Sequence, residues 1–111
     1  MMRAILAAAW LALLPLAAHA QAVTYADRSG TITLGGTAQT IMSAWPGRHG
    51  CMIQNQSTGN LWISSTATAV AASPSVLIAP GQQYLCMAPA SDGAHSIIGA
   101  TTAQAFAARE W

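Results

Sequence analysis

Apolar and polar residues follow two different patterns along this chain, one before residue 21 and one after it. From Ala4 to Ala18 almost every residue is apolar, and Pro15 alone breaks an alanine- and leucine-rich run. Further on, short apolar stretches alternate with glycine, proline, serine and asparagine at intervals of roughly 8 to 12 residues, the pattern of an all-β chain. The sequence therefore predicts a targeting segment, residues 1–20, followed by a single β domain, residues 21–111.

The targeting segment has the order of a secretory signal. Arg3 precedes the apolar run, and Ala18-His19-Ala20 places small residues at the positions that a signal peptidase reads. The run is shorter than the roughly 20 apolar residues of a membrane-spanning helix. We therefore expect cleavage after Ala20 and export to the periplasm or the cell exterior. The alternative is a retained apolar N-terminal helix that contacts a membrane.

Eight short strands are expected in the β domain. They cover residues 30–34, 38–42, 50–55, 61–64, 76–78, 83–87, 94–98 and 103–109. Gly35-Gly36 allows a tight reversal between the first two strands, and the turn residues 57–60 predict that the strands on either side of them form a hairpin. Residues 66–74 are expected to form an exposed loop. Strands of this kind suit a small antiparallel β-sandwich or a partly open barrel of seven to eight strands.

Alternation sorts the side chains of each strand into two faces. On residues 50–55, for example, Cys51 and Ile53 point to one face and Met52 and Gln54 to the other. The same reasoning gives the expected core: Ile32, Leu34, Ile41, Ile53, Leu61, Ile63, Val76, Ile78, Leu85, Ile97 and Phe106.

Charged residues are rare after the targeting segment. Three arginines (Arg28, Arg48 and Arg109) balance three acids (Asp27, Asp92 and Glu110), so the formal net charge of this part is zero, and it has no lysine. A nucleic-acid binder needs a basic stripe and a membrane-surface peptide needs a cationic face, so both classes are disfavoured. A near-neutral surface favours association, and we expect protein partners or a homo-oligomer.

The two cysteines, Cys51 and Cys86, each lie in the middle of a predicted strand. In the oxidising compartment that the leader indicates, a disulfide between them is the favoured interpretation. A bridge closing a loop of this length contributes roughly 3 to 4 kcal/mol in the chain-entropy model. Two buried free thiols are the alternative. No metal is expected, because His49 and His95 are the only histidines of the β domain and no C-x-x-C or H-x-x-x-H spacing is present.

An enzyme is not expected from the remaining residues. The three acids are hard to assemble into a catalytic pair, no nucleophile turn such as G-x-S-x-G occurs, and no cofactor motif is present. Asn55-Gln56-Ser57 matches the glycosylation pattern but is interpreted as a turn. Catalytic residues and cofactors are therefore predicted to be none.

Several aromatic and basic residues instead indicate a candidate interaction surface. Trp45, Arg48 and His49 surround a predicted turn, and Trp45 either stacks on a ligand ring or covers the open end of the fold. Trp62 is placed opposite the core face of its strand, where it meets a partner or packs on a second sheet. The predicted surface comprises Trp45, Arg48, His49, Trp62 and Trp111.

The sequence from Thr37 to Glu110 also carries a pattern of short motifs. They are Gly36-Thr37-Ala38-Gln39, Arg48 before Cys51-Met52-Ile53-Gln54-Asn55, Leu61-Trp62-Ile63, Ser73-Pro74-Ser75, Ala79-Pro80-Gly81-Gln82, and the stretch from Ile98 to Phe106. This pattern resembles small β-rich accessory proteins of tailed bacteriophages and prophages. The resemblance implies a decoration or fibre-base module that binds other virion subunits and catalyses nothing. The leader and the cysteine pair depart from it.

Two functions are favoured at this point, and a small envelope enzyme is kept as a third, which the sequence disfavours. The first is a non-enzymatic structural or interaction protein of phage-related origin, either exported or retained in a virion. The second is a periplasmic or surface module that binds carbohydrate or an envelope polymer through Trp45, Arg48 and residues 66–74.

Overall fold

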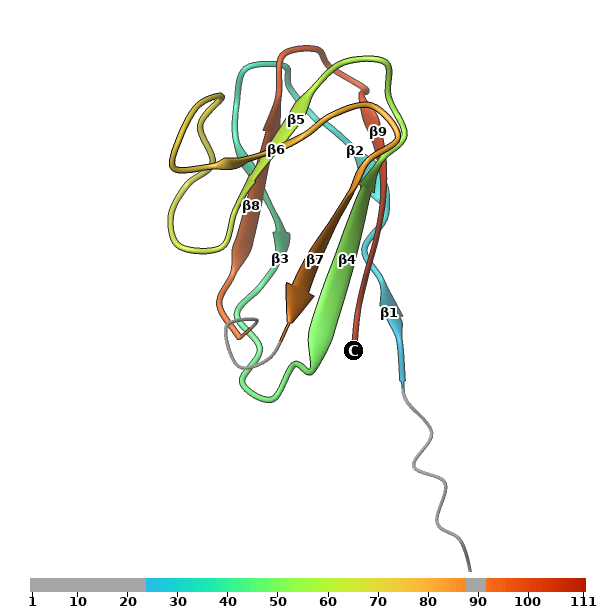
Figure 1. Cartoon of the computed structure of the whole chain (residues 1–111), viewed down its shortest axis with the longest axis vertical. Helices are drawn as coiled ribbons and strands as arrows, with labels where there is room; N and C mark the ends of the chain where they lie inside the picture. The colour runs from blue at the N-terminus through green and yellow to red at the C-terminus, as the bar shows by residue number, and fades with distance from the viewer. Residues whose placement is uncertain (1–23, 88–91) are drawn as a thin grey trace, which may run out of the picture.

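The computed structural model describes residues 24–87 and 92–111, and these form a sandwich of two antiparallel sheets (Figure 1). The predicted targeting segment lies outside the described residues. The strands are β1 (Ala26–Asp27), β2 (Gly30–Thr31), β3 (Gln39–Met42), β4 (Gly50–Asn55), β5 (Leu61–Ser64), β6 (Val76–Ile78), β7 (Gln83–Met87), β8 (His95–Gly99) and β9 (Ala105–Glu110). The predicted all-β class is confirmed, and of the two predicted architectures the structure has the sandwich, with nine strands in the described residues where seven to eight were expected.

The two sheets draw their strands from all parts of the chain. The first sheet has the order β1-β9-β4-β7, with β2 also paired to β9, and the second has the order β3-β8-β5-β6. Figure 1 shows them as two facing layers, with β4 and β7 in one and β5 and β8 in the other. Nowhere in the described ranges is there a helix long and apolar enough to cross a membrane.

The expected hairpin between β4 and β5 is wrong, because these strands lie in different sheets. β4 pairs with β7 and β9, whereas β5 pairs with β6 and β8. The fully buried Asn55 at the end of β4 donates from Nδ2 to the carbonyls of Gly59 and Ile78, both at 2.7 Å, and so holds the chain as it crosses between the sheets. The reversal at Gly35-Gly36 also joins strands of opposite sheets, β2 and β3.

Most strand positions agree closely with the sequence pattern, and the clearest differences are at the two ends of the domain. The strand expected over residues 30–34 stops at Thr31, and the short β1 before it was not expected. β9 was expected to begin at Ala103 and begins at Ala105. Ala103 has φ 69°, in the left-handed region that ends a turn and does not begin a strand.

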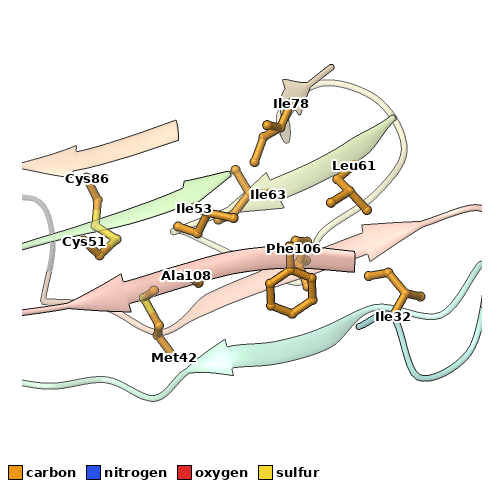
Figure 2. Close-up of a cluster of buried hydrophobic side chains, with 11 residues drawn as sticks. Ile32, Met42, Cys51, Ile53, Leu61, Ile63, Ile78, Cys86, Phe106 and Ala108 are labelled. Atoms are coloured by element: carbon orange, nitrogen blue, oxygen red, sulfur yellow. A yellow bond between two sulfur atoms is a disulfide. The ribbon is translucent and has the colours of Figure 1, made fainter. Parts of the chain in front are cut away.

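The core lies between the sheets and contains most of the expected side chains (Figure 2). Its buried members are Ile32, Met42, Cys51, Ile53, Leu61, Ile63, Ile78, Cys86, Ile97, Phe106 and Ala108, with Ile41 and Tyr84 packed against them. Three expected members are wrong: Leu34 (58% exposed), Val76 (48%) and Leu85 (58%). Leu34 lies in a bend after β2, Val76 is on the edge strand β6, and Leu85 alternates with the inward-facing Cys86.

Candidate functional site

Three of the charged side chains meet at the end of β9. Both carboxylate oxygens of Glu110 are used, since Oε1 accepts from Nε of Arg28 and Oε2 from Nε of Arg48, each at 2.7 Å. The side chains of Glu110 and Arg48 are 3% and 0% exposed, whereas that of Arg28 is 48% exposed. The carboxylate thus holds two arginines, one on each oxygen.

Arg48 also ties two loops to this network. Its NH1 donates to the carbonyl of Gly93 at 2.8 Å and its NH2 to that of Ser43 at 2.5 Å. Arg48 was expected at an interaction surface, but with 2% exposure it lies in the interior of the domain. A buried guanidinium needs this density of acceptors, because an unpaired charge in the interior costs several kcal/mol.

The alternation of side chains along β9 predicts that Glu110 is buried, although Glu110 was not among the expected core residues. Along β9, Phe106, Ala108 and Glu110 alternate with more exposed residues, so all three point to the buried face. An acid on a core face requires a cationic partner nearby. With only three arginines in the β domain, Arg48 was a candidate partner from the sequence alone.

Cys51 and Cys86 form the expected disulfide. They are Cα partners on the adjacent strands β4 and β7, with their Cα atoms 5.0 Å apart, and both side chains point into the core. Figure 2 shows the bridge at one end of the hydrophobic cluster. The disulfide therefore links two neighbouring strands of the first sheet and does not join the two sheets.

His95 on β8 faces this bridge from the second sheet. Its Nε2 lies 3.9 Å from Sγ of Cys51, and its ring is 6.5 Å from that of Tyr84. Burial, assisted by the positive charge of Arg48, lowers the pKa of His95 below its usual value. A neutral imidazole therefore stands against the two sulfur atoms.

The other predicted surface residues are spread over the domain. Trp45 is 41% exposed and borders a hollow of about 330 Å³ beside Arg28 and Glu110. His49 is exposed, and its backbone N–H donates to the carbonyl of Trp111 at 2.5 Å. The ring of Trp111 lies against Gly50, where a Cβ would come within 2.7 Å of it. Trp111 and its neighbours thus close one end of the first sheet.

Trp62 lies on the outer face of the second sheet and is partly buried. In register it stands between Leu77 of β6 and Ile98 of β8, so the three side chains form an apolar row across that face. Leu77 is 43% exposed. This row and Trp45 belong to different parts of the surface, so the structure does not assemble the predicted residues into one site.

The loop expected over residues 66–74 lies over part of the same outer face. Ser64 accepts from the backbone of Thr66 and Ala67, and Ser96 accepts from that of Ala69. A hollow of about 510 Å³ beside it is lined by small and polar residues and contains no aromatic side chain. The loop is thus not part of the hollow that Trp45 borders.

Strand β7 forms one edge of the first sheet, and no other described strand pairs with its outer side. It carries no charge and no proline, and its outward side chain Leu85 is 58% exposed. The remaining edges are protected. β6 is short and followed closely by Pro80, β3 has a register shift between Thr40 and Met42, and the β1 edge is charged.

Comparison with known proteins gives no match to this chain, whether with models of protein families, with curated proteins or with solved structures. The resemblance to phage accessory proteins therefore stays a hypothesis drawn from the sequence pattern.

Proposed function

We propose that this chain is a non-enzymatic structural and interaction module, exported or carried in a virion, that joins other protein subunits through the edge of β7. The proposal rests on the observation that the outer edge of β7 is unpaired among the described strands and carries no protecting feature. Exposed strand edges are usually blunted by charge, proline, a bulge or brevity, and β7 has none of these. Such an edge accepts a further strand by backbone hydrogen bonding.

The rest of the domain supports a binding role over catalysis. Its buried acid is occupied by two arginines, and the β domain has a formal net charge of zero. The apolar row of Trp62, Leu77 and Ile98 adds a second surface suited to protein contacts. A neutral sandwich of this kind agrees with the decoration or fibre-base role that the resemblance implies.

A matched pair of variants tests the proposal. Leu85 and Leu34 are both 58% exposed, but only Leu85 lies on the β7 edge. We expect the unmodified chain and Leu34→Lys to sediment as assemblies, alone or with particle or envelope fractions, and Leu85→Lys to sediment as a monomer. An unmodified chain that is strictly monomeric and absent from those fractions contradicts the proposal. So does assembly that Leu85→Lys leaves intact.

A second candidate is supported by the hollow beside Trp45. An exposed tryptophan next to the half-exposed Arg28 offers a stacking face and a hydrogen-bond donor, the groups that bind a sugar ring. In this form the polymer-binding function uses Arg28 in place of the buried Arg48. A folded Trp45→Ala variant then loses binding to isolated cell-wall or glycan material, and unchanged binding rejects this candidate.

A further inference from the structure

Two sulfur atoms and one imidazole converge in the interior of the sandwich. The ligand atoms of Cys51, Cys86 and His95 all lie within 4.8 Å of one another, and all three residues are buried. The cysteines come from the first sheet and the histidine from the second, so the fold, and not their spacing in the sequence, brings them together. Among the described residues, this is the only group of three or more such ligands.

The hydrogen-bonding capacity of the His95 ring is only partly used. His95 is 0% exposed, and its Nδ1 is the one buried side-chain nitrogen or oxygen in the described part of the chain that has no hydrogen-bond partner. Its other nitrogen, Nε2, lies 3.9 Å from a disulfide sulfur, and the ring also interacts with the backbone of Gly93. A metal bound beside the sulfurs would be held by Nε2, the nitrogen that faces them, and not by the unpartnered Nδ1.

The separations suit coordination once the disulfide is open. Around a metal ion with thiolate bonds of about 2.3 Å and an imidazole bond of about 2.0 to 2.1 Å, donor atoms lie roughly 3.5 to 4 Å apart. The present distance from Nε2 of His95 to Sγ of Cys51 is already 3.9 Å. The Cα atoms of the two cysteines, 5.0 Å apart, allow their sulfurs to separate by side-chain rotation alone.

The charge of the surroundings also fits. Two thiolates and a monovalent cation carry a net charge of −1. The neighbouring network of Arg28, Arg48 and Glu110 carries a net charge of +1. It is close enough to His95 for the charges of Arg48 and Glu110 to shift the pKa of that residue.

We propose that the dithiol form of this protein binds a soft d¹⁰ cation, Cu(I) before Zn(II), through Cys51, Cys86 and His95. A thiol reductant opens the disulfide in a two-electron exchange, which yields two protein thiols and oxidises two reductant thiols to a disulfide. The cation then displaces both thiol protons and forms two metal–sulfur bonds. Two thiolates and one imidazole match the ligand preference and three-coordination of Cu(I). Disulfide and metal exclude each other.

Copper titration of the purified full chain tests this site. Samples with the disulfide intact, and samples reduced by a phosphine under anaerobic conditions, are titrated with Cu(I) against the chromogenic chelator bicinchoninate. We expect the reduced chain to bind one Cu(I) and the disulfide form to bind none. His95→Gln is expected to weaken binding at least about tenfold, as loss of a metal-site residue does. His49→Gln, which changes an exposed histidine, is the matched control and is expected to bind normally.

X-ray absorption at the copper edge gives a readout that needs no variant, and near-ultraviolet circular dichroism reports whether each sample is folded. The expected first shell is two sulfurs and one nitrogen. Equal copper binding by the reduced and disulfide forms overturns the proposal. A first shell of sulfur alone, or a folded His95→Gln that binds as tightly as the unmodified chain, overturns it as well.

Discussion

The Nε atom of Arg48 lies 2.7 Å from Oε2 of Glu110, and both side chains are almost fully shielded from water. Glu110 lies on β9 and Arg48 precedes β4, so the pair connects regions that are distant in sequence. Through its bonds to Gly93 and Ser43, Arg48 also positions the loops before β8 and after β3. One ion pair thus organises a whole end of the sandwich.

Glu110→Gln is expected to lower the free energy of unfolding by about 3 to 5 kcal/mol, because it leaves the Arg48 charge buried without its counter-charge. Urea denaturation followed by tryptophan fluorescence measures the change. Arg28→Gln serves as the comparison. The side chain of Arg28 is 48% exposed, so its loss costs less than about 1 kcal/mol. Equal effects from the two variants would contradict the role given to Arg48.

Asn55→Ala is expected to destabilise the domain by about 2 to 3 kcal/mol, since it removes the buried donor to the carbonyl of Ile78 and one of the two side-chain donors to the carbonyl of Gly59. Asn60→Ala, at an exposed position in the same turn, changes stability by less than about 0.5 kcal/mol. Chemical denaturation compares the two. If Asn55→Ala leaves the free energy of unfolding unchanged, Asn55 does not hold the chain where it crosses between the sheets.

Opening the Cys51–Cys86 disulfide is expected to lower stability by about 3 to 4 kcal/mol, because the unfolded chain regains the freedom of the closed loop. Intact-mass analysis with an alkylating agent shows whether the bond is present, since both thiols react only after reduction. Denaturation with and without reductant then gives the energy. Alkylation of two thiols in the untreated, unfolded protein would show that the bond is not formed.

Ala103→Gly is expected to stabilise the protein by about 0.5 to 1 kcal/mol. Ala103 has φ 69°, a conformation that costs an L-residue roughly 1 to 2 kcal/mol and costs glycine almost nothing. Glycine also gives the unfolded chain more conformational entropy, which offsets part of this stabilisation. Ala100→Gly, in the same connection but without a positive φ, is expected to be neutral or destabilising. A rise in the melting temperature for Ala103→Gly alone is the predicted result.

Strand positions could be predicted from the sequence because each depends on a local alternation of side chains. The pattern placed Cys51 and Ile53 inward correctly. The prediction was wrong at Leu85, which was assigned to the core because it is hydrophobic. Side chains along a strand alternate between the two faces, so Leu85 faces outward because its neighbour Cys86 faces the core. The same period along β9 is enough to place Glu110 on the buried face.

Strand partners could not be predicted, because turn residues report only that the chain reverses. Ser57 to Asn60 make a turn whether the next strand pairs with β4 or crosses to the other sheet. The choice depends on long-range contacts such as that between Asn55 and Ile78. Long-range contacts also bring His95 next to the two cysteines, so the spacing of these residues in the sequence could not predict the group.

The position of β9 inside the first sheet sets the order in which the domain can be completed. β9 pairs with β1 and β2 on one side and with β4 on the other, yet it is the last of the described strands to be synthesised. Until it emerges, the strands that enclose it have no common neighbour, and the long-range pairing that remains is slow to form. The first sheet therefore stays unfinished until β9 is made, whereas the second sheet contains no strand from this last segment.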